Sequence, residues 1–203
     1  MVSAPRRVLV ATSNAGKVVE IAAILGELQV EWISLDDVSS VDFPEEGGDY
    51  RANAEAKARA AALQSGYFAV ADDSGLEVAA LDGGPGPYSA RFGGAGLDDR
   101  GRVNALLAAL EGVPAAGREA RFVCIAALAD PAGDTWSTRG ECSGRIATEL
   151  RGDSGFGYDP IFQLDGRPER MAEVTVEEKN RISHRALAFR ALVPELSRRL
   201  ESG

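Results

Sequence analysis

Two adjacent carboxylates, Asp72 and Asp73, follow directly after a short apolar run from Phe68 to Ala71. Such a run is typical of a buried strand, so we expect the pair at a strand end, immediately before Ser74-Gly75. Adjacent carboxylates repel each other unless a cation or hydrogen-bond donors compensate. Magnesium prefers one or two carboxylates together with waters and phosphate oxygens, so this pair could hold such a metal. An acidic turn whose Asp side chains bind their own backbone is an equally good alternative.

A second candidate segment is Thr12-Ser13-Asn14-Ala15-Gly16-Lys17. It stands between a strand expected over Val8 to Ala11 and a helix whose apolar spacing begins at Ile21. Free backbone N–H groups at a helix start, together with a lysine, suit a phosphate. The segment is not a Walker A loop, because the first glycine is missing and Val18 follows the lysine. Taken alone, a plain capped turn is the better interpretation.

Two further segments could contact a base. Phe156 and Tyr158 alternate with glycines and precede Asp159. An aromatic ring in such a loop can stack on a purine, and a nearby carboxylate can accept from a ring N–H. The alternative is a turn whose two aromatic residues pack in the core.

The stretch near the C-terminus groups Lys179, Asn180, Ser183, His184 and Arg185. Hypoxanthine and xanthine carry an acceptor at O6, where adenine carries an amino donor. Aligned donors would therefore favour 6-oxo purines and leave adenine with unpaired polar groups. A helix cap with a surface ion pair is the simpler alternative.

Two other chemistries fit the sequence poorly. Gly152-Asp153-Ser154-Gly155 is similar to the nucleophile loop of chymotrypsin-like proteases, but the sole histidine, His184, follows the serine instead of preceding it. A thiol dyad of Cys142 with His184 has no supporting pattern.

Composition limits the remaining possibilities. The chain has 203 residues and a formal charge of −9, which argues against a protein that coats nucleic acid, because that role needs a basic surface. Apolar runs are too short to span a membrane, and we expect no membrane association. The only cysteines are Cys124 and Cys142, which indicates a reducing compartment, and we expect a cytoplasmic protein.

The elements that must position these residues alternate between strands and helices. We expect a helix over Asp49 to Gln64 and a last helix that continues through Pro194. Further strands are expected over the following ranges: Arg121 to Ala129, Thr135 to Glu141, Gly144 to Ala147, and Tyr158 to Leu164. The first two of these should form a hairpin. This order predicts a mixed α/β fold without a domain linker.

Together these motifs resemble the inosine triphosphate pyrophosphatase family, also described as non-standard purine NTP pyrophosphatases. The matching stretches, in the family's order along nearly the whole chain, are Ala11 to Lys17, Asn53-Ala54 with Lys57-Ala58, Ala71 to Leu76, Pro85 to Arg91, Gly155 to Phe162, and Glu178 to Asn180 with Ile182 to Arg185. Each motif is weak by itself, but six in order are specific.

The resemblance implies a single domain over residues 1–203, with a long twisted mixed sheet flanked by helices and two lobes that enclose a nucleotide cleft. It implies a homodimer that uses Mg2+ and binds a small nucleotide, not a nucleic acid. The implied reaction cleaves ITP, dITP or XTP between the α- and β-phosphates, yielding a monophosphate and pyrophosphate.

The resemblance also assigns roles to residues. Asp73 would bind the metal and activate water, and Lys17 would stabilise charge on the phosphates. Phosphate contacts would come from Thr12, Ser13, Asn14, Ala15, Gly16, Lys17 and Ser74. Base contacts would come from Phe156, Gly157, Tyr158, Asp159, Lys179, His184 and Arg185.

The chain departs from the family pattern before the second helix. It reads Asp49-Tyr50-Arg51-Ala52-Asn53, where the family often has Thr-Phe-x-Glu-Asn, and it is one residue short there. The second metal carboxylate is therefore assigned to Glu46, with Glu45 close behind. Two alternatives stay open: a pyrophosphatase for modified pyrimidine or 7-methylguanine nucleotides, and a nucleotide sensor without turnover.

Overall fold

The computed structural model describes residues 6–26 and 28–202. The strands are β1 (Arg6–Val10), β2 (Val30–Ile33), β3 (Phe68–Val78), β4 (Pro85–Gly86), β5 (Glu119–Ala129), β6 (Thr135–Ile146) and β7 (Phe162–Leu164). The helices are α1 (Ala15–Ile24), α2 (Tyr50–Ser65), α3 (Asp99–Ala109), α4 (Val176–Ile182) and α5 (His184–Ser202). Among these helices of the described chain, none combines the length and apolar character needed to cross a membrane.

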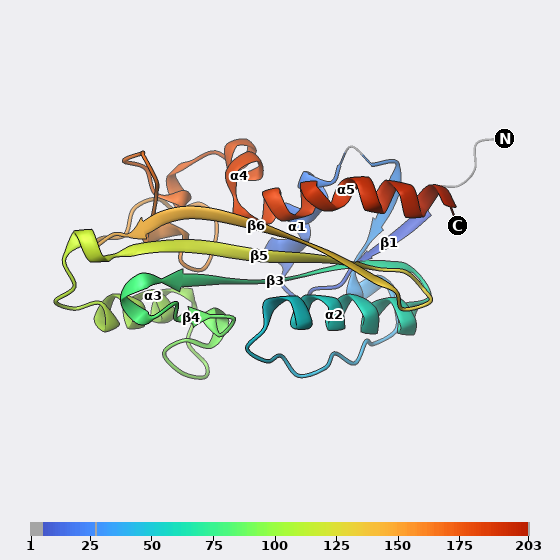
Figure 1. Ribbon diagram of the computed structural model, residues 1–203, viewed down its shortest axis with the longest axis horizontal. Coiled ribbons are helices and arrows are strands. Elements are labelled where there is room, and N and C mark those ends of the chain that lie inside the picture. The colour runs from blue at the N-terminus through green and yellow to red at the C-terminus, as the bar shows by residue number, and fades with distance from the viewer. Residues whose placement is uncertain (1–5, 27, 203) are drawn as a thin grey trace. The chain divides into compact units, whose positions relative to one another are not determined.

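The strands form one mixed sheet in the order β2-β1-β3-β5-β6-β7, with β4 added beside β3. β1 runs parallel to β2 and to β3. β4 is antiparallel to β3, and β7 is antiparallel to β6. The predicted α/β fold with a mixed sheet and flanking helices is therefore confirmed (Figure 1).

The chain divides into two compact units. Unit 1 takes the chain up to Asp73, Cys124–Gly140 and the chain from Arg185 on. Unit 2 takes Ser74–Val123 and Glu141–His184. The long strands β3, β5 and β6 therefore each contribute residues to both units.

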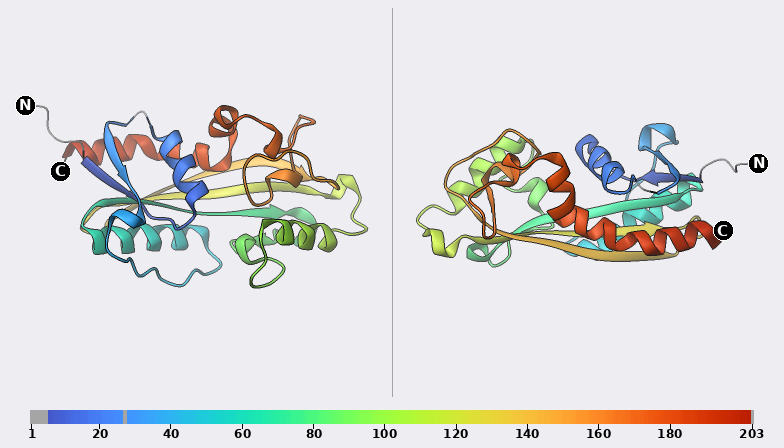
Figure 2. Two further views of the ribbon diagram at one scale, coloured as in Figure 1. Left: turned by 180° about the vertical axis from the view of Figure 1, so that it is seen from behind. Right: turned by 90° about the horizontal axis from the view of Figure 1, so that it is seen from above.

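In unit 1, helices cover both faces of the sheet. α1 and α5 share one apolar cluster with even-numbered strand residues such as Val8, Val70 and Cys124. α2 lies on the opposite side of the sheet from α5 (Figures 1 and 2). Four small residues of α2 are fully buried and let its backbone approach closely: Ala54, Ala58, Ala61 and Ala62.

The limits of α2 follow from its sequence. Asp49 caps the helix by accepting from Ala52 N–H at 2.9 Å. Gly66 ends it in the left-handed region at φ 75°, where glycine carries no steric penalty. The predicted helix over Asp49 to Gln64 is therefore confirmed to within one residue.

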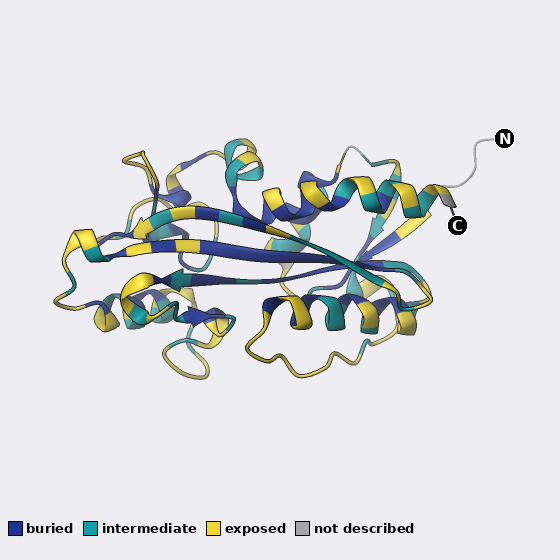
Figure 3. Ribbon diagram, viewed as in Figure 1, coloured by how far each residue is buried: buried dark blue, intermediate teal, exposed yellow. Residues whose placement is uncertain are grey.

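Unit 2 has its own core. Leu76, Val103, Phe122, Ile146 and Phe162 belong to one buried cluster, and Figure 3 shows the buried residues along β3 and β5. Asp98 caps α3 by accepting from Gly101 N–H at 2.7 Å.

Three strand predictions need correction. β3 does not end at Ala71 but runs on to Val78, because its second half pairs with β4 at Leu76 and Glu77. The strand expected over Gly144 to Ala147 is the end of β6. β7 is shorter than expected, because a 3-10 turn containing Pro160 occupies Asp159–Ile161, and proline lacks the N–H that a sheet pairing needs.

Candidate functional site

Asp72 and Asp73 lie within β3 rather than at the strand end that the sequence predicted, and the alternative of an acidic turn is wrong. Successive side chains of a strand point to opposite faces of the sheet. Val70 and Asp72 therefore share the face of α1 and α5, whereas Asp73 points to the face of α2. The two carboxylates have different partners as a result.

On the first face, Asp72 belongs to a buried ion network. Lys17 Nζ of α1 lies 2.9 Å from Asp72 Oδ2 and donates to Oδ1 at 3.1 Å. Arg185, in the first turn of α5, donates to Asp72 Oδ2 through Nε at 3.3 Å and Nη2 at 3.2 Å. Its Nη1 donates to Glu20 of α1. Two cations and two carboxylates thus balance each other.

Burial makes this network strong. The side chains of Asp72 and Arg185 are 0% and 2% exposed. Burial alone would lower the pKa of Arg185, but Asp72 and Glu20 raise it above its ordinary value. Arg185 is therefore a permanent cation that holds Asp72 in place, and Asp72 in turn holds Lys17.

On the second face, Asp73 meets residues of α2 and the loop before it. Asn53 Nδ2 donates to Asp73 Oδ2 at 2.8 Å. Lys57 Nζ lies 3.6 Å from Asp73 Oδ1 and donates to Glu46 Oε1 at 2.8 Å. Asn53 also exchanges two hydrogen bonds with the Gly47 backbone, at 2.8 and 2.9 Å. One helix thereby orients Asp73 and fixes the loop that carries Glu46.

The charges on this face are less well balanced. Burial raises the pKa of Asp73 above its ordinary value, although Lys57 and Asn53 act in the opposite direction. Burial would lower the pKa of Lys57, but Asp72, Asp73 and Glu46 raise it. Glu46 raises the pKa of Asp73 as well, so a further cation beside these two carboxylates would relieve their repulsion.

This donor set fits a magnesium ion. The described residues contain no group of three or more His, Cys, Asp or Glu side chains placed to bind a metal. Magnesium, however, is commonly bound by only one or two carboxylates, with the substrate's phosphates completing its shell. Asp73 and Glu46 supply two carboxylates that share Lys57 as a partner.

The predicted phosphate segment has the form of a capped helix start. Asn14 caps α1 by accepting from Lys17 N–H at 3.2 Å, and Asn14 N–H donates to Thr12 Oγ1 at 3.2 Å. Ser13 and Gly16 are exposed. The segment thus combines an accessible helix N-terminus with Lys17. Ser74 follows Asp73 in β3 and is half-buried.

In unit 2, hydrogen bonds and an ion pair hold the loop of residues 155–159 that the sequence predicted to contact a base, called the base loop below. Buried Asp159 accepts from Phe156 N–H at 3.0 Å and pairs with Lys179 Nζ at 2.7 Å. Lys179 Nζ also lies 4.7 Å from the centre of the Phe156 ring. The structure thus brings together Phe156, Asp159 and Lys179, which the sequence placed in two separate motifs.

Tyr158 and His184 pack into the unit 2 core. Tyr158 Oη donates to Ser89 O at 2.9 Å, and burial raises the pKa of Tyr158 to about 12. The His184 ring stacks on Phe122, with centroids 4.8 Å apart. His184 and Arg185 are thus neighbours in sequence with separate surroundings, since the Arg185 guanidinium bonds to residues of unit 1.

Sequence reasoning assigned no site role to Asn53, Lys57 or Glu20. The first two could have been found, because residues four apart on a helix share a face, and both belong to an otherwise alanine-rich helix. Glu20 gave no such signal. Its partner Arg185 lies 165 residues away in sequence.

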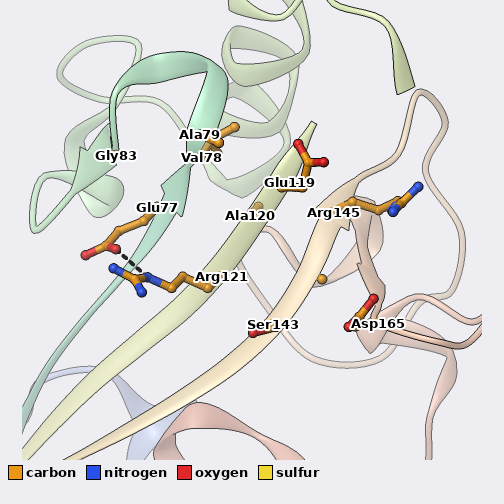
Figure 4. Close-up of a pocket in the computed structure, with 11 residues that line it drawn as sticks. Glu77, Val78, Ala79, Gly83, Glu119, Ala120, Arg121, Ser143, Arg145 and Asp165 are labelled. Atoms are coloured by element: carbon orange, nitrogen blue, oxygen red, sulfur yellow. Dashed lines mark hydrogen bonds and ion pairs between the residues drawn. The ribbon is translucent and has the colours of Figure 1, made fainter. Parts of the chain in front are cut away.

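Among the described residues, two of the cavities are lined by unit 2 alone. One, of about 470 Å3, is lined by the start of α3 at Asp99 and by residues of the base loop, including Phe156. The other, of about 430 Å3, lies on the sheet and contains the ion pair of Glu77 with Arg121 at 2.7 Å (Figure 4). Its lining, as far as the described residues show it, includes none of the predicted site residues.

Comparisons with known proteins show the family of this chain. Residues 8–195 match the model of the Ham1 family. A dITP/XTP pyrophosphatase of Deinococcus deserti is 51% identical and covers 92% of this chain and 88% of its own. A dITP/XTP pyrophosphatase of Exiguobacterium sibiricum is 45% identical and covers 94% of this chain and 97% of its own.

Solved structures give the same result. A HAM1 protein from Coxiella burnetii superposes with a TM-score of 0.85 at 38% identity, covering 95% of this chain and 99% of its own. A nucleoside-triphosphatase, also called a dITP/XTP pyrophosphatase, from Mycobacterium abscessus gives a TM-score of 0.74 at 42% identity, covering 94% and 98%. The resemblance noted in the sequence is confirmed, and the chain belongs to the Ham1 family.

Proposed function

We propose that this protein hydrolyses deaminated purine nucleoside triphosphates, namely dITP, ITP and XTP, to the monophosphate and pyrophosphate. Such an activity removes deaminated purines from the nucleotide pool. Relatives that span nearly the whole chain are dITP/XTP pyrophosphatases, which supports the reaction and the substrate class. The observation that carries the proposal within this chain is the placement of Asp73 between Asn53 and Lys57, on the sheet face opposite the Asp72 network.

Asp73 is the proposed proton acceptor for the attacking water. Asn53 holds one of its oxygens by a hydrogen bond of 2.8 Å, so the carboxylate is oriented before substrate arrives. Because burial raises the pKa of Asp73, the ionised carboxylate is a stronger base than an exposed aspartate.

Asp73 and Glu46 are the proposed ligands of Mg2+, with Glu45 as the alternative to Glu46. When bound, the metal would neutralise charge on the phosphates. Lys57 already contacts both carboxylates and keeps them close together while no metal is bound.

The triphosphate is proposed to lie at the start of α1. Exposed backbone N–H groups and the helix dipole favour an anion there. Asp72 keeps Lys17 Nζ within 2.9 Å, which limits the directions in which the ammonium group can point. The phosphate-binding set is Thr12, Ser13, Asn14, Ala15, Gly16, Lys17 and Ser74.

The base-reading set remains as the sequence predicted it: Phe156, Gly157, Tyr158, Asp159, Lys179, His184 and Arg185. Phe156 offers a ring face for stacking. Lys179 is a donor held by Asp159 at 2.7 Å and suits a 6-oxo acceptor. Arg185 has the additional task of holding Asp72.

A substrate panel tests this function. It contains dITP, XTP, ITP, dATP, dGTP, a modified pyrimidine triphosphate and 7-methyl-GTP, each with and without Mg2+. Pyrophosphate and orthophosphate are measured separately. We expect magnesium-dependent pyrophosphate release, fastest from the deaminated purines. Preferred release from the pyrimidine or 7-methylguanine nucleotide, orthophosphate as the product, or binding without turnover would contradict the proposal.

Two predictions accompany this function. A homodimer is expected, and light scattering on the purified protein tests it. A cytoplasmic location is expected because the sequence has only two cysteines, Cys124 and Cys142, and both are buried, and fractionation of cells that make the protein tests it.

A further inference from the structure

Asp99 is the first residue of α3, yet the helix does not use its side chain as a cap. Asp98 fills that role, with Oδ1 accepting from Gly101 N–H at 2.7 Å. Asp99 Oδ2 instead accepts from Gly157 N–H at 2.7 Å, a residue 58 positions later in sequence. The other oxygen, Oδ1, pairs with Arg102 at 2.5 Å. Two neighbouring carboxylates therefore serve different segments of unit 2.

The segment held by Asp99 is the base loop. Gly155 and Gly157 flank Phe156, and both have positive φ, 80° and 60°. Such backbone conformations are readily left by glycine when nothing restrains them. On the Gly155 side the loop is packed closely, because a Cβ there would lie 2.1 Å from Asp159 Oδ2. On the Gly157 side a Cβ would meet nothing within 4 Å.

Two carboxylates, one from the same loop and one from a distant segment, therefore accept hydrogen bonds from consecutive backbone N–H groups. Asp159 takes the N–H of Phe156 at 3.0 Å and Asp99 takes that of Gly157 at 2.7 Å. A hydrogen bond to an ionised acceptor is about twice as strong as a neutral one. Burial would raise the pKa of Asp99, but Gly157 N–H and Arg102 lower it below its ordinary value, so this acceptor is ionised at neutral pH.

Asp99 also shares a cavity with the residue it would influence. Asp99, Phe156 and Gly157 all line the space of about 470 Å3 in unit 2. Loss of the Asp99 contact would release the more open side of the base loop, because Gly157 has no side chain that could pack against a neighbour. The Phe156 ring would then lose its fixed direction.

We infer that Asp99 is a positioning residue that holds the base loop in the conformation that selects the base. This inference rests on the proposed function, since it assigns Phe156 to base stacking. Asp99 itself contacts the loop backbone and not the reacting atoms. Its removal should therefore affect substrate affinity and base preference more than the rate of the chemical step.

The test compares Asp99→Ala, Asp99→Asn and Asp98→Ala. Asp98→Ala is the matched control, because it removes the neighbouring carboxylate and a helix cap but no bond to the loop. Kinetics with dITP and dATP give KM, kcat and the preference ratio. Hydrogen exchange of residues 155–157 reports the loop directly, without substrate.

We expect Asp99→Ala to raise KM for dITP about tenfold, the effect of one lost charge-assisted bond, with kcat changed by less than about threefold. The preference for dITP over dATP should fall, and exchange at Gly157 should accelerate. Asp99→Asn keeps a neutral acceptor and should recover most of KM. Asp98→Ala should leave KM and the preference ratio unchanged.

Two results distinguish a failure of the proposed function from a failure of the Asp99 inference alone. If the unmodified protein releases no pyrophosphate from any deaminated purine, the proposed function fails, and this inference fails with it. If the unmodified protein is active but Asp99→Ala keeps its KM, its preference ratio or its exchange protection at Gly157, the inference alone is overturned.

Discussion

Asp72 and Asp73 are consecutive residues of β3, yet their side chains have different partners on the two faces of the strand. Asp72 contacts two cations, Lys17 and Arg185, and its side chain has no exposed area. Asp73 has an amide, Asn53, as its hydrogen-bond donor and one ammonium group, Lys57, 3.6 Å away. A carboxylate with saturated partners suits structure, whereas one that stays partly uncompensated suits a metal and a proton.

This difference arises from the strand itself. Alternation sends the two side chains to opposite faces, and the helices on those faces carry different residues. α1 and α5 supply Lys17, Glu20 and Arg185, whereas α2 supplies Asn53 and Lys57. Identical residue types thereby acquire separate tasks, which substitutions at each face can distinguish.

The largest effect is expected at the Asp73 face, on activity. Asp73→Asn should lower turnover of dITP by about 10³- to 10⁴-fold, because it removes the proton acceptor and a proposed metal ligand. The unfolding free energy should change by less than about 1 kcal/mol, since the variant removes a charge whose burial is unfavourable. Steady-state pyrophosphate release and urea unfolding measure the two quantities. Turnover within a few-fold of normal would remove Asp73 from this role.

The next effect is expected at the Asp72 face, on stability. Asp72→Ala leaves Arg185 buried without its main counter-charge, and breaking a buried ion pair in this way costs about 3–5 kcal/mol. Urea unfolding followed by circular dichroism measures the loss. A change below about 1 kcal/mol would show that the network contributes little to the fold.

A smaller effect is expected at Glu20. Glu20→Gln keeps the shape and an acceptor for Arg185 Nη1 but removes one negative charge. The expected loss is about 1–2 kcal/mol, the difference between a charged and a neutral hydrogen bond. Combined with Asp72→Ala, the losses should not add, because both residues share Arg185. Additive losses in the double variant would argue against a single network.

The smallest effect concerns pH. The folded-state pKa of Asp73 is raised above its unfolded value, chiefly by burial. Its contribution to stability is therefore fully present below the unfolded pKa and is lost as pH rises through the folded pKa. Without magnesium, the stability of Asp73→Asn relative to the unmodified protein should rise as pH increases through that window. Unfolding free energies of both proteins between about pH 3.5 and 7 test this, and a constant difference would contradict it.

The sequence predicted the helices of this region better than the strand between them. α2 was recognised with its closely spaced alanines, and its predicted bounds hold to within one residue. The strand end predicted after Ala71 was wrong, because β3 continues to Val78 and pairs with β4. Only within a strand do two adjacent side chains point to opposite faces of a sheet. Ending the strand too early therefore concealed the different surroundings of Asp72 and Asp73.

Long-range partners were also hidden. The sequence grouped His184 and Arg185 because they are adjacent, but the Arg185 guanidinium bonds to Asp72, 113 residues away. No local pattern predicts such a pairing. By contrast, Asp159 and Lys179 both belonged to motifs that the sequence analysis assigned to base binding. Their contact therefore lies between residues that were already expected to be close together.

The most direct measurement compares Asp72→Asn with Asp73→Asn, which make the same chemical change at adjacent positions. Pyrophosphate release from dITP and the urea midpoint are recorded on the same preparations, with magnesium present for the first and absent for the second. We predict that Asp73→Asn loses turnover while keeping its midpoint, and that Asp72→Asn has a clearly lowered midpoint. Equal losses of turnover and equal midpoints in the two variants would contradict the separation of tasks between the two faces of β3.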